Sequence, residues 1–128
     1  MKLLLDTCTF LWLAALESKL SAKAREALED GRNTLVLSQV SSWELQIKHQ
    51  NGQLGLADTP ANFVAEGLRL HDIQYAPLSD AAIWHLQKLP SHHKDPFDRM
   101  LIATALTGSM QIVTPDQQIH RYPLPVIW

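Results

Sequence analysis

The chain has 128 residues, of which 46% are hydrophobic and 19% are charged, a balance that indicates a folded globular domain and argues against a disordered chain. Its single cysteine, Cys8, excludes an intramolecular disulfide and any CxxC pair. No stretch approaches the ~20 apolar residues of a membrane span, and the three leucines before Asp6 are too few for a secretory signal. We therefore expect a cytoplasmic protein with no membrane partner. The net charge of −2 leaves a nucleic-acid partner undecided, because such a partner usually requires a basic surface.

Short apolar runs and capping residues divide the chain into alternating strands and helices. The segments expected to form strands are residues 2–5, 34–37, 73–75, 110–113 and 125–127. The segments expected to form helices are residues 7–16, 22–29, 38–49, 60–70, 79–89 and 96–106. Ser21, Ser38 and Asp95 are suited to cap the helices that follow them, and Pro60 and Pro96 to occupy first helical positions.

This alternation predicts an α/β fold in one domain, residues 1–128. Successive parallel strands need crossover connections, which are right-handed and place helices on both faces of the sheet. We therefore predict a three-layer α/β/α fold around a mainly parallel central sheet. Ligands of such sheets bind beyond the carboxyl ends of the strands, so acids at those ends are candidate site residues.

Two acidic residues follow predicted strands. Asp6 comes directly after the first strand, and Asp116 comes three residues after the end of the fourth. Each also has a simple structural alternative, because an aspartate after a strand often caps the next helix. Neither residue indicates a site when it is taken alone.

Two further acids lie on the apolar faces of predicted helices. Glu44 shares its face with Val40, which predicts a half-buried carboxylate; the alternative is a surface pair with Lys48, four residues later. Asp98 is predicted to point inward from the first turn of its helix. Its alternative is a capping-box carboxylate that bonds back to the amide of Asp95.

The four acids lie in four segments that are all expected near one end of the sheet. Two carboxylates ~4 Å apart repel by roughly 4 kcal/mol at an effective dielectric of 20, so such a group persists only with cations or raised pKa values. Oxygen-only ligation favours Mg²⁺ or Mn²⁺ over zinc. The chemistry that fits is hydrolysis of a phosphodiester by metal-activated water, without a covalent intermediate.

These segments resemble the successive motifs of VapC-type PIN domains, the toxins of type II toxin–antitoxin systems. The matching motifs are Leu4-Leu5-Asp6-Thr7, Ser41-Ser42-Trp43-Glu44, His93-Lys94-Asp95-Pro96-Phe97-Asp98-Arg99-Met100-Leu101-Ile102-Ala103 and Thr114-Pro115-Asp116. The third motif is the most specific, and the resemblance continues to Trp128, so it covers essentially the whole chain.

The resemblance implies a sheet with strand order 3-2-1-4-5 and an endoribonuclease that depends on Mg²⁺ or Mn²⁺. It implies the toxin of a VapBC-type pair, with an RNA substrate and a cognate antitoxin as partners. We also expect a homodimer, within a larger toxin–antitoxin assembly.

The resemblance also assigns roles to single residues. Asp6 and Asp98 would be the principal metal ligands, and Glu44 and Asp116 would complete the catalytic site directly or through water. Auxiliary roles would fall to Thr7 and Thr114, which would orient carboxylates or waters, and to Asp95, whose capping position already gives it a structural role.

Two other classes of function stay open. One is another Asp-centred phosphohydrolase, although a haloacid-dehalogenase-type enzyme needs a second aspartate where this chain has Cys8. The other is a non-catalytic PIN-like scaffold, against which the intact acid set argues, because a scaffold gains nothing from unpaired buried carboxylates.

Several other residues have two interpretations each. The polar residues around the third motif line the mouth of the pocket and meet RNA phosphate, or they form a solvated loop; they are His92, His93, Lys94 and Arg99. Cys8 is a low-pKa thiol or a small buried filler. Leu11, Trp12 and Leu16 line a groove for an antitoxin helix or belong to the core.

Overall fold

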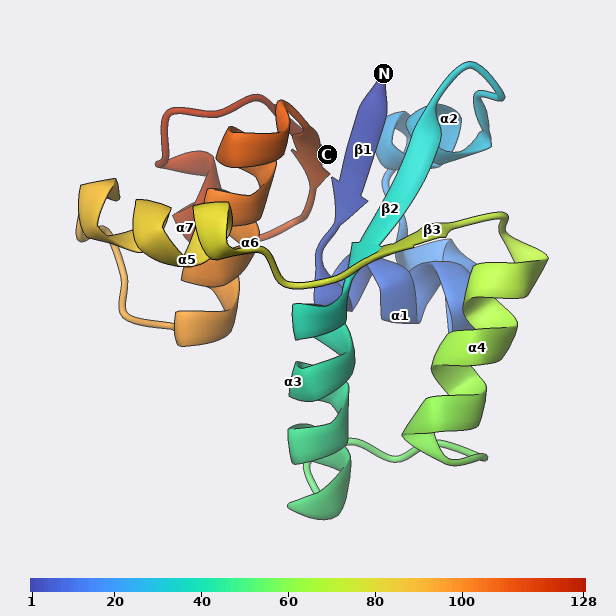
Figure 1. Ribbon diagram of the computed structural model, residues 1–128. Coiled ribbons are helices and arrows are strands. Elements are labelled where there is room, and N and C mark those ends of the chain that lie inside the picture. The colour runs from blue at the N-terminus through green and yellow to red at the C-terminus, as the bar shows by residue number, and fades with distance from the viewer.

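Runs of leucine, isoleucine and valine form the centre of the computed structural model, which describes residues 1–128 (Figure 1). Five strands form one sheet: β1 (Lys2–Leu5), β2 (Thr34–Ser38), β3 (Gln74–Ala76), β4 (Gln111–Val113) and β5 (Val126–Ile127). Their order is β3-β2-β1-β4-β5 and all neighbouring pairs are parallel. The predicted α/β class and the strand order 3-2-1-4-5 are therefore confirmed.

Seven α-helices connect or follow the strands: α1 (Thr7–Ala15), α2 (Ala22–Glu29), α3 (Gln39–Gln50), α4 (Pro60–Leu70), α5 (Asp80–His85), α6 (Pro96–Gly108) and α7 (Gln117–His120). Two short 3₁₀ helices, η1 (Glu17–Lys19) and η2 (Leu86–Lys88), follow α1 and α5. The side chains of Ser21, Ser38 and Asp95 accept backbone N–H bonds at the starts of α2, α3 and α6, as the sequence predicts. No helix combines the length and the apolar character that crossing a membrane requires.

Several elements differ from the prediction: the predicted helix 79–89 divides into α5 and η2, and β3, β4 and β5 each begin one residue later than expected. The third strand begins one residue late, because the N–H of Ile73 bonds to the carbonyl of Leu68 and so closes the end of α4 instead of pairing in the sheet. The helix α7 has only four residues, too few to give a periodic apolar pattern. Its capping residue, Asp116, was the only signal for it.

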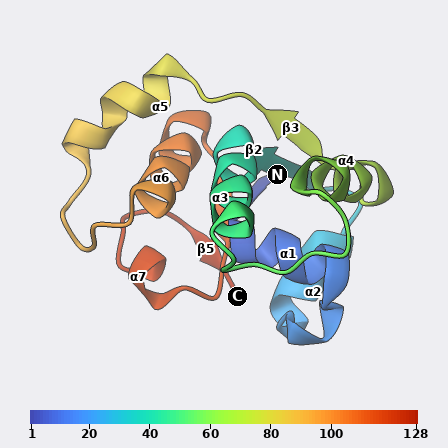
Figure 2. The ribbon, with the colours of Figure 1, turned by 90° about the horizontal axis from the view of Figure 1, so that it is seen from below.

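Alternate residues of β1 face two separate cores, which divides the molecule into three layers. Leu3 and Leu5 pack with side chains from α1, α2 and α4, whereas Leu4 packs with side chains from α5, α6 and α7. Figure 2 shows the two helical groups on opposite sides of the sheet. Each fully buried leucine contributes about 1.5–3 kcal/mol relative to an exposed one, so this alternation fixes the register of the central strand.

The parallel pairing of β1 with β4 brings two distant segments to the same edge of the sheet. Leu5 is opposite Val113 in the register, so the residues that follow both strands emerge side by side. The N–H of Asp6 and the hydroxyl of Thr9 both donate to the carbonyl of Val113, at 3.3 and 2.7 Å. In Figure 1 the arrowheads of β1 and β2 point to this edge, where α1 and α3 begin.

Candidate metal centre

The four predicted acids line a single pocket of about 480 Å³ at the carboxyl edge of the sheet. It is formed by Asp6, Glu44, Asp98 and Asp116, and its remaining wall includes Thr7, Cys8, Lys48 and Asp95. The acids come from the ends of β1 and β4 and from the helices α3 and α6. Four segments far apart in the sequence therefore meet there.

Asp6 is both a helix cap and a pocket residue. One carboxylate oxygen accepts a hydrogen bond from the N–H of Thr9 at 2.7 Å, and the other accepts one from the hydroxyl of Thr114. Only 5% of the residue is exposed, and this burial raises the pKa of Asp6 above its ordinary value, although the hydrogen bonds from Thr114 and Thr9 act in the opposite direction. Each carboxylate oxygen keeps a second lone pair, so capping does not prevent Asp6 from binding a cation.

Glu44 combines the two interpretations that the sequence left open. Its Oε2 pairs with Nζ of Lys48 at 2.6 Å, so the predicted alternative of an i,i+4 pair forms. Yet the Glu44 side chain is only 6% exposed, while that of Lys48 is 47% exposed. Oε1 accepts a hydrogen bond from the hydroxyl of Thr7 at 2.6 Å, and Ser41 lies 3.0 Å from the same hydroxyl. Glu44 is thus a buried carboxylate with an ammonium group at the pocket rim.

The negative charge of Asp98 is also unfavourable in this pocket. Burial, together with the charges of Asp95, Glu44 and the other two acids, raises the pKa of Asp98 to about 8. Asp95 accepts a hydrogen bond from the N–H of Asp98 at 3.0 Å and so caps α6. The reciprocal bond of a capping box, from the Asp95 amide to the Asp98 carboxylate, does not form, so that alternative for Asp98 is wrong.

Asp116 follows β4 and caps α7 through a bond from the N–H of Gln118 at 2.8 Å. Its own N–H donates to the hydroxyl oxygen of Thr114 at 3.0 Å. Thr114 is fully buried and therefore holds Asp6 and Asp116 through one hydroxyl group. The two threonines of the predicted motifs, Thr7 and Thr114, both orient an acid of the pocket.

His93 is a residue that the sequence left between two interpretations, a lining of the pocket mouth and a solvated loop. Its side chain is only 14% exposed, and its Nε2 lies 3.4 Å from Oδ2 of Asp98. One donor atom each from His93, Asp98 and Asp116 lies within 4.8 Å of the others. The interpretation of His93 as part of a solvated loop is therefore wrong. A loop has no periodicity that would mark one face as buried, so only its place in the third motif gave any signal.

Arg99 does not lie at the pocket mouth, in contrast to the expectation that it meets phosphate there. Its guanidinium donates to the carbonyls of Pro90 and Leu86 and to the hydroxyl of Tyr122. Arg99 therefore fastens the loop before α6 to the body of the fold. Because all of these partners are internal, the arginine has a structural role.

Cys8 is not a reactive thiol. Burial and the neighbouring charge of Asp6 raise the pKa of the Cys8 thiol to about 11, so it stays protonated near neutral pH. Of the residues assigned to a groove or to the core, Trp12 packs against Trp128 at 5.7 Å between ring centroids, while Leu16 is 50% exposed. Trp12 therefore contributes to packing, whereas Leu16, at the end of α1, lies at the surface.

The donor set of the pocket fits a hard divalent cation. Carboxylate oxygens are the ligands that Mg²⁺ and Mn²⁺ prefer, and burial together with the charges of the neighbouring acids raises the pKa of Asp98. Lys48 is the one basic residue that lines the pocket, and it is already paired with Glu44. Two of the acids are already held in fixed orientations, Asp6 by a hydrogen bond from Thr114 and Glu44 by one from Thr7.

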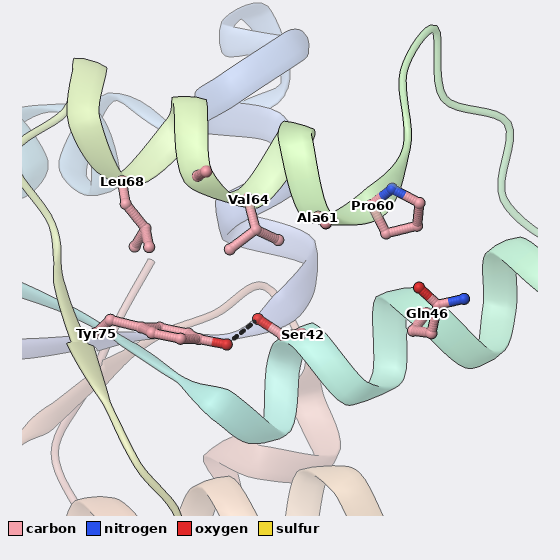
Figure 3. Close-up of a pocket in the computed structure, with 8 residues that line it drawn as sticks. Ser42, Gln46, Pro60, Ala61, Val64, Leu68 and Tyr75 are labelled. Carbon is pink, nitrogen blue, oxygen red and sulfur yellow. Dashed lines mark hydrogen bonds between the residues drawn. The ribbon is translucent and has the colours of Figure 1, made fainter.

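A second pocket, of about 370 Å³, lies between α3 and α4 and has a different character (Figure 3). Its wall is mainly apolar, with Pro60, Val64 and Leu68 on α4. At its edge the hydroxyl of Tyr75 donates to Oγ of Ser42 at 2.7 Å. No acid, histidine or cysteine lines it, so it offers a surface for contact and no groups for hydrolysis.

The sequence profile of the PIN domain family matches residues 3–124. The chain is a PIN domain. Among curated proteins, this PIN domain is 30% identical to ribonuclease VapC22 of Mycobacterium tuberculosis over 132 aligned residues, which cover 98% of this chain and 97% of that protein. Identity and coverage of that size place the PIN domain with the VapC proteins.

Solved VapBC structures share the fold of this PIN domain. VapBC2 from Rickettsia felis, bound to a DNA fragment from its promoter, matches with a TM-score of 0.70 at 14% identity and covers 98% of this chain and 97% of that one. VapBC-5 from Mycobacterium tuberculosis, a member of the VapBC family of toxin–antitoxin systems, matches with a TM-score of 0.59 at 17% identity. The match covers 94% of this chain and 89% of that one. At these identities the likeness shows the fold alone.

Proposed function

We propose that this PIN domain is a VapC-type endoribonuclease, the toxin of a VapBC-type toxin–antitoxin pair. It hydrolyses RNA phosphodiester bonds with Mg²⁺ or Mn²⁺ held by the four-carboxylate pocket. The observation that carries the proposal is the convergence of Asp6, Glu44, Asp98 and Asp116 on one pocket. The name of the 30% identical relative, a ribonuclease, supports RNA as the substrate.

In this proposal the four acids have two kinds of role. Asp6 and Asp98 are the principal ligands, and Glu44 and Asp116 bind the cation directly or through water. A bound divalent cation supplies Lewis-acid polarisation of the phosphodiester and lowers the pKa of water at the site. Asp95 is auxiliary, because it caps α6 and its charge raises the pKa of Asp98.

The remaining polar residues prepare the site for the substrate. Thr7 and Thr114 hold Glu44 and Asp6 in fixed orientations, so little side-chain entropy is lost when a cation binds. Lys48 is half-exposed and is the one basic residue that lines the pocket, so its ammonium group can meet an RNA phosphate there. RNA phosphate would enter past Lys48, toward the acids.

Exposed apolar side chains away from the acidic pocket support the protein partners in this proposal. Trp43 is 58% exposed and Tyr75 45% exposed, and together with Leu78 they line a further pocket beside the one in Figure 3. We assign this face to the homodimer contact, and the partly exposed face around Trp12 and Leu16 to the antitoxin. Leu78→Asp should then lower the mass of the protein in solution from dimer to monomer, whereas Leu16→Asp should leave it unchanged and weaken antitoxin binding.

Cleavage of defined RNA by the purified protein tests the proposed activity. Wild type should cut single-stranded RNA at discrete sites with Mg²⁺ or Mn²⁺, leave double-stranded DNA intact and lose activity with a chelator. Asp6→Asn and Asp98→Asn should lose both cleavage and cation binding, while Asp80→Asn, at an exposed position outside the pocket, should retain them. A protein that binds the cation but cuts no RNA under any of these conditions would be a scaffold.

A further inference from the structure

We propose that Nε2 of His93 is a further ligand of the cation, beside Asp98 and Asp116, and that this nitrogen makes the site select Mn²⁺ over Mg²⁺. The inference rests on the proposed function, because it takes the acidic pocket to bind a divalent cation. It adds a nitrogen donor to a set that otherwise offers only oxygen.

The first observation is that Nε2 of His93 is a buried polar atom without a hydrogen-bond partner. It lies 3.4 Å from Oδ2 of Asp98, but no hydrogen bond forms between them. Buried polar atoms nearly always have a partner, and one that lacks it points to a group missing from its surroundings. Next to two carboxylates, the group that satisfies a nitrogen lone pair is a cation.

The second observation is the spacing of the donor atoms. Those of His93, Asp98 and Asp116 all lie within 4.8 Å of one another. Two ligands on opposite sides of a cation with bonds of about 2.1 Å are about 4.2 Å apart, so the three donor atoms are near enough to share one cation after their side chains adjust. No other set of three histidine, cysteine or acidic side chains in the chain meets this spacing.

The third observation is what holds the imidazole ring. Nδ1 of His93 lies 2.9 Å from the hydroxyl oxygen of Tyr122, and Arg99 donates a hydrogen bond to the same oxygen at 3.3 Å. A metal-binding histidine almost always donates its second ring N–H to an oxygen, which fixes the ring and leaves the other nitrogen free for the metal. Tyr122 is only 3% exposed, so this support is rigid.

The ligand type predicts which metal is favoured. Imidazole nitrogen suits transition metals, whereas Mg²⁺ prefers oxygen alone. A site with Asp98, Asp116 and His93 should therefore bind Mn²⁺ more tightly than Mg²⁺, and the difference should depend on His93. A residue that only positioned Asp98 would affect both metals equally.

The test is Mn²⁺ and Mg²⁺ titration by calorimetry, combined with pulsed electron paramagnetic resonance of bound Mn²⁺ in protein with ¹⁵N-labelled histidine. Wild type should show coupling of Mn²⁺ to a histidine ¹⁵N, which requires no variant and no activity measurement. His93→Gln should lose this coupling and bind Mn²⁺ at least about tenfold more weakly, the lower bound for loss of a metal-supporting residue. Mg²⁺ affinity should change much less.

His92→Gln is the matched control, because His92 packs edge-on against Tyr122 and does not belong to the cluster of donor atoms. It should keep the coupling and both affinities. Mn²⁺ binding without histidine coupling in wild type, or equal losses for both metals in His93→Gln, would overturn the role of His93 and leave the proposed nuclease intact. Absence of binding of either cation would overturn the proposed function as well.

Discussion

At the scale of single residues, the folded chain brings together carboxylates whose negative charges repel one another. Asp98 is partly buried among three other acids and Asp95, and its pKa is raised from 3.8 to about 8. The pKa of Asp6 is raised as well, mainly by burial. In the absence of metal, burial therefore disfavours the charged form of both groups, so the stability of the fold and the binding of a cation are linked to pH.

The metal-free protein should lose stability as pH rises from about 4 to about 8. Over this range the unfolded chain has released the proton of Asp98 while the folded chain still holds it, so the folded state binds more protons and is disfavoured as pH rises. Asp98→Asn should flatten this dependence and melt at a higher temperature than wild type at pH 8. Melting curves with a chelator between pH 5 and pH 8.5 measure it, with Asp80→Asn as the control. A variant that kept the wild-type slope would contradict the assignment to Asp98.

Substitutions of Glu44 and Lys48 should affect cleavage and stability to different extents. Glu44→Gln removes the charge but keeps an acceptor for Thr7, so cleavage should fall about 100-fold or more while stability falls by about 0.5 kcal/mol. Lys48→Met leaves the buried Glu44 carboxylate without its ammonium partner, which should cost about 1–3 kcal/mol. Cleavage rates and metal-free unfolding of the two variants test this. Equal effects on cleavage would show that the pair acts as a unit.

At the scale of the elements, helix starts were predictable and loop conformations were not. The caps Ser21, Ser38 and Asp95 mark real helix starts because each side chain satisfies a backbone N–H locally. The position of His93 depends instead on Tyr122 and Asp98, which come from other parts of the fold. Contacts of that kind leave no periodic pattern in the sequence.

The close packing of α4 on α1 depends on Gly67. A Cβ at this position would lie 2.6 Å from Cζ of Phe10, whose ring is fully buried. Gly67→Ala should therefore destabilise the fold by about 1–3 kcal/mol through overpacking, even though alanine is the better helix former. Gly55→Ala, which meets no atom within 4 Å, is the matched control. Denaturant unfolding of both variants measures the difference, and an equal or higher stability of Gly67→Ala would show that α4 can shift away from α1.

At the scale of the whole molecule, the strand order places the four acids of the pocket at one edge of the sheet. The four acids could be predicted from the sequence because each follows a strand or shares an apolar helix face, and parallel strands bring their ends together. The sequence could not show whether an aspartate that caps a helix also belongs to the site. Asp6 and Asp116 are caps and pocket residues at once.

Cation binding should stabilise the entire fold. A ligand at 100 times its Kd raises the free energy of unfolding by about 2.7 kcal/mol if it binds only the native state, and the four acids lie together only there. The increase in melting temperature with Mg²⁺ or Mn²⁺ should be larger at pH 8 than at pH 6, because at pH 6 the cation must displace the proton of Asp98. Calorimetric melting at both pH values measures this. An increase that is independent of pH would place the cation away from Asp98.

The hydrogen bond from Thr114 to Asp6 joins residues that are 108 positions apart, and this separation has a consequence for biosynthesis. A nascent chain that ends before β4 has neither the partner of β1 at the sheet edge nor the hydroxyl that orients Asp6. Domains fold as units while synthesis proceeds from the N-terminus, so the carboxylate site assembles only after Thr114 and Asp116 have left the ribosome. Translation itself therefore delays the appearance of a complete pocket until Thr114 and Asp116 have been made.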